Sequence, residues 1–295
     1  MLDKIARIRV LLCEPTFGLA GYWREPPPMR IDQKKMRELA ARTSPFSPDE
    51  LRREANVFYV GGNLPERQTI ETLYDSHYQS NALLFHLTFG DADKFTNGES
   101  LARLIKKNFN ARLVGRIDFA APPHLIERAY AAGVDILDIP LHSFDRDRFP
   151  EPGWQGAERL RSLEYARSIF PRWCVVSSLT AAVEPAVSTV AGIDLLLERE
   201  IVPLVQLSEE AASSSVEELT RVFSHLQGSW QKKRALIKPL LPLICLISPF
   251  AQSTQKGILR GFIDSIDDRR LLATSDLRRL LRVKEVAESF ESSGL

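Results

Sequence analysis

Short apolar runs alternate with amphipathic stretches through the middle of the chain, from residue 56 to residue 232. The apolar runs are rich in Val, Leu, Ile and Phe, which is typical of parallel strands that are buried on both faces. Six such strands are predicted, over Asn56–Gly61, Ala82–Phe89, Ala111–Phe119, Val134–His142, Trp173–Thr180 and Val202–Ser208.

The stretches between these runs carry apolar residues at helical spacing. The clearest of them starts after a double proline and stops at Gly133, which matches the preference for proline at the start of a helix and glycine after its end. Helices are predicted over Ser100–Phe109, Pro123–Ala132, Ala157–Ile169, Ala186–Arg199 and Val216–Lys232. This alternation predicts right-handed βαβ units around a parallel sheet.

Residues 1–55 and 233–295 stand outside the alternation. We therefore predict three parts: an N-terminal extension (1–55), an α/β barrel (56–232) and a C-terminal helical extension (233–295). In the first part, Ile31–Arg42 and Pro48–Glu54 are predicted to be helical. The apolar run Ala235–Ala251 is broken by prolines and is shorter than the roughly 20 residues of a membrane-spanning helix. We interpret it as buried core or partner surface and do not expect a membrane contact.

The two faces of the predicted strands differ in polarity, because alternate side chains of a strand point to opposite sides. One face is apolar throughout, and the other becomes polar toward the C-terminal end. The polar set includes His86, Thr88, Arg116, Asp118, Asp138, His142, Gln206 and Ser208. Buried charges must be paired or must face water, so we expect this set to line a barrel with a solvated pocket at the C-terminal ends of its strands. A structural network, with Arg116 paired to Asp118 or Asp138, is the alternative.

The composition of the chain bears on which partners it could bind and in which compartment it is found. With 39 basic and 38 acidic residues the formal net charge is +1, which gives no electrostatic case for binding nucleic acid. The three cysteines, Cys13, Cys174 and Cys245, are far apart, so neither a disulfide framework nor a zinc ribbon is expected. Charges occupy the place where a signal peptide has its apolar centre, and we expect a cytoplasmic protein.

Three segments resemble the radical S-adenosylmethionine (SAM) superfamily in their order and spacing. Ala129–His142 is similar to the third helix and fourth strand of that family, and Ser177–Thr189 to its fifth strand and the following turn. Leu195–Val205 is similar to the entry into its sixth strand. The resemblance covers Asn56 to Glu209 and implies a partial TIM-like (β/α)6 barrel.

The chain departs from that family where the chemistry is located. Members carry a CxxxCxxC loop after the first strand, and the free iron of its 4Fe-4S cluster binds SAM. The equivalent stretch here, Val60–Tyr74, has no cysteine, so we do not expect a cysteine-ligated cluster. The glycine-rich motif after the second strand is reduced to Gly90 and Asp91, which leaves SAM as a candidate ligand only. The cofactor-binding residues that the resemblance implies are Gly90, Asp91, Ser178, Glu184, Gln206 and Ser208.

Two functions are consistent with this pattern. The first is a non-catalytic accessory subunit that pairs with a cluster-bearing radical SAM enzyme in small-molecule or cofactor modification. The segment Tyr22–Pro28 and the apolar C-terminal region are candidate interfaces, although both could simply cover the open side of the barrel.

The second function is an independent barrel enzyme of lyase or hydrolase type. His86 and His142 are predicted at the mouths of the second and fourth strands, with Asp118 and Asp138 nearby. These four candidate catalytic residues could act through a metal ion, or as acid and base with His142 oriented by Asp138 or Asp145. Glu184 could contact a ligand or complement the dipole of the helix that follows it.

Overall fold

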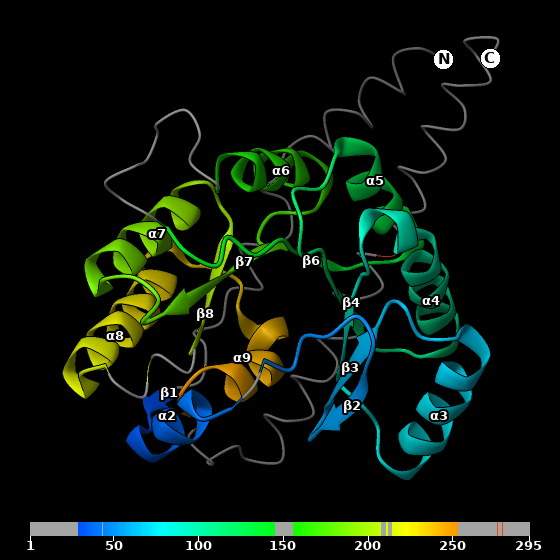
Figure 1. Ribbon diagram of the computed structural model, residues 1–295, viewed down its shortest axis with the longest axis horizontal. Helices are drawn as coiled ribbons and strands as arrows, with labels where there is room; N and C mark the ends of the chain where they lie inside the picture. Colours follow the sequence, from blue (N-terminus) through cyan, green and yellow to red (C-terminus); the bar gives the residue numbers. More distant parts are fainter. Residues whose placement is uncertain are drawn as a thin grey trace, which may run out of the picture.

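A computed structural model describes residues 29–42, 44–144, 156–207, 211, 214–252, 276 and 279. Its main sheet has seven strands in the order β2-β3-β4-β5-β6-β7-β8. Strand β2 runs antiparallel to β3, and the pairs from β3 to β8 are parallel. The sheet curls into an open, partial barrel whose outer face is covered by helices (Figure 1). The predicted α/β partial-barrel class is therefore confirmed.

The strands of the main sheet are β2 (Leu51–Glu54), β3 (Val57–Gly61), β4 (Leu84–Thr88), β5 (Arg112–Arg116), β6 (Ile136–Asp138), β7 (Val175–Ala181) and β8 (Val202–Leu207). The outer helices are α3 (Glu66–Gln79), α4 (Phe95–Asn108), α5 (Pro123–Ala132), α6 (Gly156–Ile169), α7 (Ala186–Glu198) and α8 (Val216–Lys233). A short 3-10 helix, η1 (Ala92–Lys94), precedes α4.

One prediction about local structure is wrong, and one helix was missed. The segment predicted as a helix over Pro48–Glu54 contains strand β2, because pairing Leu51 with Val60 extends the sheet by one strand. Helix α3 was not predicted at all. It buries only Thr69 and Leu73 against the sheet, so its apolar periodicity is weak in the sequence.

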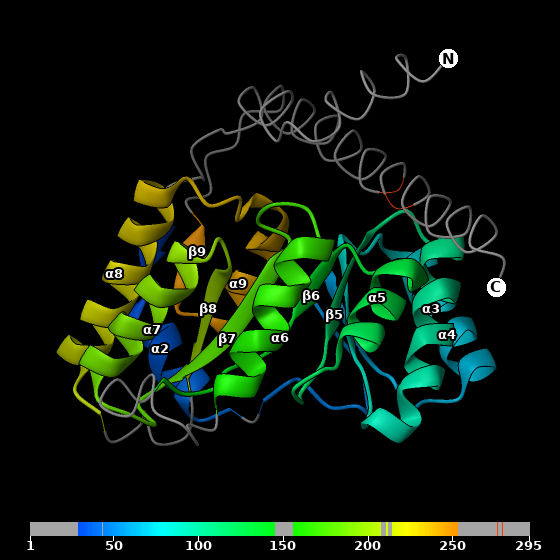
Figure 2. The same ribbon diagram turned by 90° about the horizontal axis from the view of Figure 1, so that it is seen from above.

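A second small sheet and a second group of helices close the open side of the barrel. Strand β1 (Met29–Ile31) pairs antiparallel with β9 (Phe250–Gln252). Helix α2 (Gln33–Ala40), η3 (Lys238–Leu240) and α9 (Leu241–Ile247) lie with them. Figure 2 shows α2, α9 and β9 gathered at the β8 end of the sheet, away from α3 and α4.

The free edge of β8 is covered by side chains from α8 and from the segment after α9. Pro203 has no backbone N–H to donate, which suits an edge strand. The Trp230 indole donates a hydrogen bond to the Pro203 carbonyl at 3.2 Å, and the Ser248 hydroxyl donates to the Val205 carbonyl at 2.5 Å. Lys35 donates to the carbonyls of Cys245 and Phe250, which ties α2 to the end of α9.

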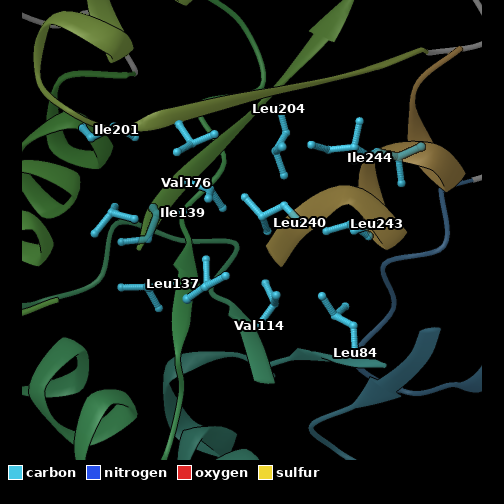
Figure 3. Packing of buried hydrophobic residues seen from close by; sticks show 14 of the residues in the cluster. Leu84, Val114, Leu137, Ile139, Val176, Ile201, Leu204, Leu240, Leu243 and Ile244 are labelled. Carbon is cyan, nitrogen blue, oxygen red and sulfur yellow. The ribbon is translucent and has the colours of Figure 1, made fainter. Parts of the chain in front are cut away.

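The N-terminal half of the barrel interior is filled by η3 and α9. Leu240, Leu243 and Ile244 have no exposed surface, and they face inward side chains such as Val114 and Leu204 (Figure 3). The apolar run Ala235–Ala251 is therefore mostly core of its own barrel. Within the described residues, no helix is both long and apolar enough to cross a membrane.

Candidate functional site

A buried cluster of polar side chains lies on the inner face where strands β5, β6 and β7 end. Arg116 and Asp138 are paired residues of adjacent strands. Arg116 Nη1 lies 3.1 Å from Asp138 Oδ2, and the Ser178 hydroxyl donates to the same oxygen at 3.0 Å. The side chains of Arg116 and Asp138 are 3% and 1% exposed. The alternation of the strands thus brings together two predicted inward residues, Arg116 and Asp138, and Ser178, which was predicted as a cofactor-binding residue.

The guanidinium of Arg116 is enclosed on its other sides. Its Nε donates to Asp118 Oδ1 at 2.9 Å, and its Cζ lies 4.3 Å from the centre of the Phe46 ring. Burial raises the pKa of Asp138 to about 6, while the neighbouring Arg116 opposes that rise. A buried carboxylate of this kind depends on its cation, since an unpaired charge in the interior is costly.

His142 lies beside the cluster at the end of β6 in an unusual backbone conformation. Its φ is 63°, in the left-handed region that favours glycine. The backbone is held there because His142 N–H donates to Ser178 O at 3.0 Å and His142 O accepts from Thr180 N–H at 2.6 Å. Strain of this kind persists only where the surroundings enforce it, and it is found most often at functional sites.

The imidazole of His142 is partly exposed and close to a carboxylate. Its Nε2 lies 3.9 Å from Asp118 Oδ1, and the two side chains are 44% and 39% exposed. Burial lowers the pKa of His142, and the nearby Arg116 and Arg159 lower it further. His142 is therefore neutral at pH 7 and has the protonation state of a general base.

Two side chains that were not predicted as a pair hold this corner of the barrel. Arg159 on α6 donates to the backbone carbonyls of Pro140, at 2.7 Å, and Asp118. Glu184 accepts from the Phe144 backbone N–H at 2.8 Å. The Glu184 carboxylate thus secures the turn after β6. Arg159 gave no sequence signal, because its position on a predicted helix is ordinary for an arginine.

His86 does not lie where the sequence predicted. It was expected at the mouth of its strand, but it is in the middle of β4 and has no exposed surface. Its ring lies 4.5 Å from that of Phe46 and 5.7 Å from that of Tyr59, centre to centre. Burial, reinforced by Arg116, lowers the pKa of His86 to about 3. His86 therefore contacts an aromatic group rather than the Asp118–His142 corner.

The remaining predicted ligand-binding residues are spread over strand β8 and several loops. Gln206 donates to the Thr180 hydroxyl at 3.2 Å on the inner face. Gly90 is buried, Asp91 is exposed at the start of η1, and Glu184 borders a surface hollow of about 300 Å3 between the first turns of α7 and α8. Ser208, Asp145 and the segment Tyr22–Pro28 lie outside the described residues.

The turn after β3 occupies the place that the resemblance assigns to a cluster loop. Gly62 N–H donates to Thr88 O at 2.7 Å, and the Asn97 amide donates to Leu64 O at 2.9 Å. A side chain at Gly62 would not fit, because its Cβ would lie 2.8 Å from the backbone oxygen of Thr88. A Cβ on Gly90 would lie 2.1 Å from Asn63 Oδ1, so the Asn63 side chain would have to shift.

The residues of this turn do not fit a cysteine-ligated iron–sulfur cluster, because thiolates are the ligands of such clusters and the turn has none. Cys174 precedes β7, at the opposite end of the strands, and Cys245 lies within α9. Cys13 is outside the described residues. Among the residues that the structure covers, no group of three or more His, Cys, Asp or Glu side chains is arranged to hold a metal ion.

Comparisons with known proteins found similarity in structure and none to a family model or a curated sequence. No protein-family model matches it, and neither does any curated protein. Among solved structures, it is similar to the crystal structure of methylornithine synthase (PylB), with 15% sequence identity and a TM-score of 0.44. The match covers 63% of this chain and 60% of that one, so it spans less than two thirds of the solved protein.

Proposed function

We propose that this chain is a radical-SAM-like barrel protein without a cysteine-ligated 4Fe-4S cluster of its own. In this proposal it is a non-catalytic accessory subunit of a cluster-bearing enzyme that modifies a small molecule or cofactor. The observation that carries the proposal is the turn after β3, which lacks cysteine and is packed against the β4 turn by Gly62 and Gly90.

The barrel interior supports a structural role for its charges. Arg116 is already bonded to two carboxylates and covered by Phe46, so its guanidinium is not free to clamp a ligand anion. The α9 segment fills the other half of the interior with apolar side chains. An accessory protein needs only this stable scaffold and a surface for its partner.

The proposal is tested by anaerobic purification followed by iron, sulfide and SAM-binding measurements. We expect substoichiometric iron and acid-labile sulfide, unchanged in a Cys174→Ser, Cys245→Ser variant, and a stable complex on co-expression with a cluster-bearing barrel enzyme. Stoichiometric iron and sulfide would overturn the cluster-free part. A chain that forms no complex with such enzymes would overturn the accessory part.

A second candidate, an independent hydrolase or lyase, is favoured by one observation: the strained and partly exposed His142 next to Asp118. In this candidate His142 removes a proton and Asp118 stabilises the resulting imidazolium. The test is hydrolysis of 4-nitrophenyl acetate by the wild type, by His142→Gln and by His124→Gln, in which an exposed histidine on α5 is changed as a control. Loss of turnover in His142→Gln alone supports the candidate, and equal rates in all three exclude His142 as the base.

A further inference from the structure

Three buried polar atoms that lack a hydrogen-bond partner among the described residues belong to two side chains whose rings contact one aromatic ring on the β3–β4 side of the barrel. They are the Tyr59 hydroxyl and both ring nitrogens of His86, and the described residues offer none of them a partner. Tyr59 and His86 are 3% and 0% exposed. Buried polar groups in native proteins are nearly always bonded, so such a group calls for an explanation.

The aromatic side chain at the centre of this group is Phe46, from the loop between α2 and β2. Its ring lies 4.5 Å from the His86 ring at 33°, and 5.8 Å from the Tyr59 ring at 66°. The Arg116 guanidinium lies 4.3 Å from its centre. Phe46 thus lies against two planar groups, Arg116 and His86, but it has no polar atom to offer Tyr59 or His86. It is also only partly buried and belongs to a loop rather than to the sheet.

We propose that Phe46 occupies a binding site for a small, planar, uncharged ring that carries both a hydrogen-bond donor and an acceptor. The ligand is planar because it would lie against Arg116 and His86 in the place of the Phe46 ring, and small because the space is that of one six-membered ring. It is uncharged because Arg116 is already paired with Asp118 and Asp138. Its polar edge would bond Tyr59 or His86, which Phe46 leaves unbonded.

Binding in this site requires the Phe46 side chain to move out, and no part of the sheet has to move with it. Phe46 lies between two prolines, Pro45 and Pro48, in a loop that is first bonded to the sheet side at Pro48, whose carbonyl accepts from Asn63 N–H at 2.8 Å. When the ligand ring replaces the Phe46 ring, the ring contacts are kept and hydrogen bonds are added. The ligand therefore binds better than Phe46 only through its polar edge. This inference does not depend on the accessory role proposed above.

The experiment compares two probes of the same size, 2-pyridone and benzene, in a Phe46→Ala variant whose folding is verified by thermal unfolding. We expect 2-pyridone to bind at least tenfold more tightly than benzene, measured by NMR titration, because only 2-pyridone can form the hydrogen bonds. Adding Tyr59→Phe or His86→Phe should reduce that preference severalfold, since each change removes the polar atoms and keeps the ring. In the wild type, 2-pyridone should bind more weakly and shift the Phe46 ring signals.

Three results would overturn the inference. Equal or tighter binding of benzene would show an apolar hollow, in which the polar atoms are satisfied by water alone. An undiminished preference for 2-pyridone in both Tyr59→Phe and His86→Phe would place the probe elsewhere. A folded Phe46→Ala variant that binds neither probe would show that the loop closes the space. If that variant does not fold, the wild type decides: Phe46 ring signals that stay unchanged at saturating 2-pyridone exclude the exchange.

Discussion

Acidification should unfold this protein partly through one residue, His86. The imidazole is neutral in the folded barrel, because it is fully buried and lies near Arg116, and its pKa is lowered to about 3. In the unfolded chain its pKa is near the ordinary value of 6.5. Between these two values the unfolded chain binds a proton that the folded chain does not, so the stability falls as the pH falls.

The size of the effect follows from the two pKa values. The interval from 6.5 to about 3, at about 1.4 kcal/mol for each pH unit, corresponds to a loss of about 5 kcal/mol once the pH is below both values. At pH 4.5 about 3 kcal/mol of this would already be lost. Native domains have only about 5–15 kcal/mol of stability in total, so the contribution should be visible in simple unfolding experiments.

Asp138 acts in the opposite direction over part of the same range. Its pKa is raised from 3.8 to about 6, so the folded state takes up a proton first and gains stability as the pH falls between these values. The contribution of His86 to the pH dependence of stability is therefore obtained by subtracting the unfolding free energies of a variant that lacks this histidine. A His86→Phe variant keeps the ring contacts with Phe46 and Tyr59 but cannot titrate, and Asp138 is unchanged in it.

The assay is urea unfolding of the wild type and His86→Phe from pH 7.5 to pH 4.5, followed by tryptophan fluorescence. The free energy of unfolding of the wild type should fall relative to that of the variant by about 3 kcal/mol over this range. If the two curves stay parallel, His86 titrates alike in both states. Its burial in the barrel, as described, would then be incorrect.

Three further changes test the interior and the strained turn. Arg116→Met should lower the free energy of unfolding by about 3–5 kcal/mol in urea at pH 7.5, because it leaves Asp138 buried and unpaired. Adding Asp138→Leu should recover much of that loss, and no recovery would contradict the pairing. His142→Gly should raise the free energy of unfolding by about 1 kcal/mol where His142→Ala does not, since only glycine relieves the left-handed φ, and equal effects would argue against strain. Leu243→Ala should cost about 2–5 kcal/mol by leaving a cavity in the barrel, and a much smaller loss would mean that α9 does not fill the interior.

The sheet and its outer helices were largely predictable from the chain. Runs of branched apolar residues marked the six parallel strands, and helix α5 was placed at its observed bounds by Pro123 and Gly133. Strand β2 and helix α3 were not predicted. Both have weak apolar patterns, because β2 is only half-buried at the edge of the sheet and α3 buries few residues.

The polar side chains were predictable as a set but not in their contacts. Alternation placed Arg116 and Asp138 on the inner face, and the parallel pairing of β5 with β6 made them neighbours. The position of His86 away from the mouth was missed, since strand alternation gives the face of a residue but not its depth. The cover on Arg116 was missed too, because Phe46 comes from a loop with no periodic pattern.

The sequence by itself determined the order of the six parallel strands and of five outer helices, the inward set of polar residues and the lack of cysteine after the first parallel strand. These features follow from local periodicity and composition, which can be read directly from the sequence. The tertiary structure alone decided that α9 fills the barrel, that Phe46 covers Arg116, and that Tyr59 and His86 are buried with no hydrogen-bond partner for their polar side-chain atoms among the described residues. Those contacts join residues far apart in sequence, and only the closing of the curled sheet brings them within reach of one another.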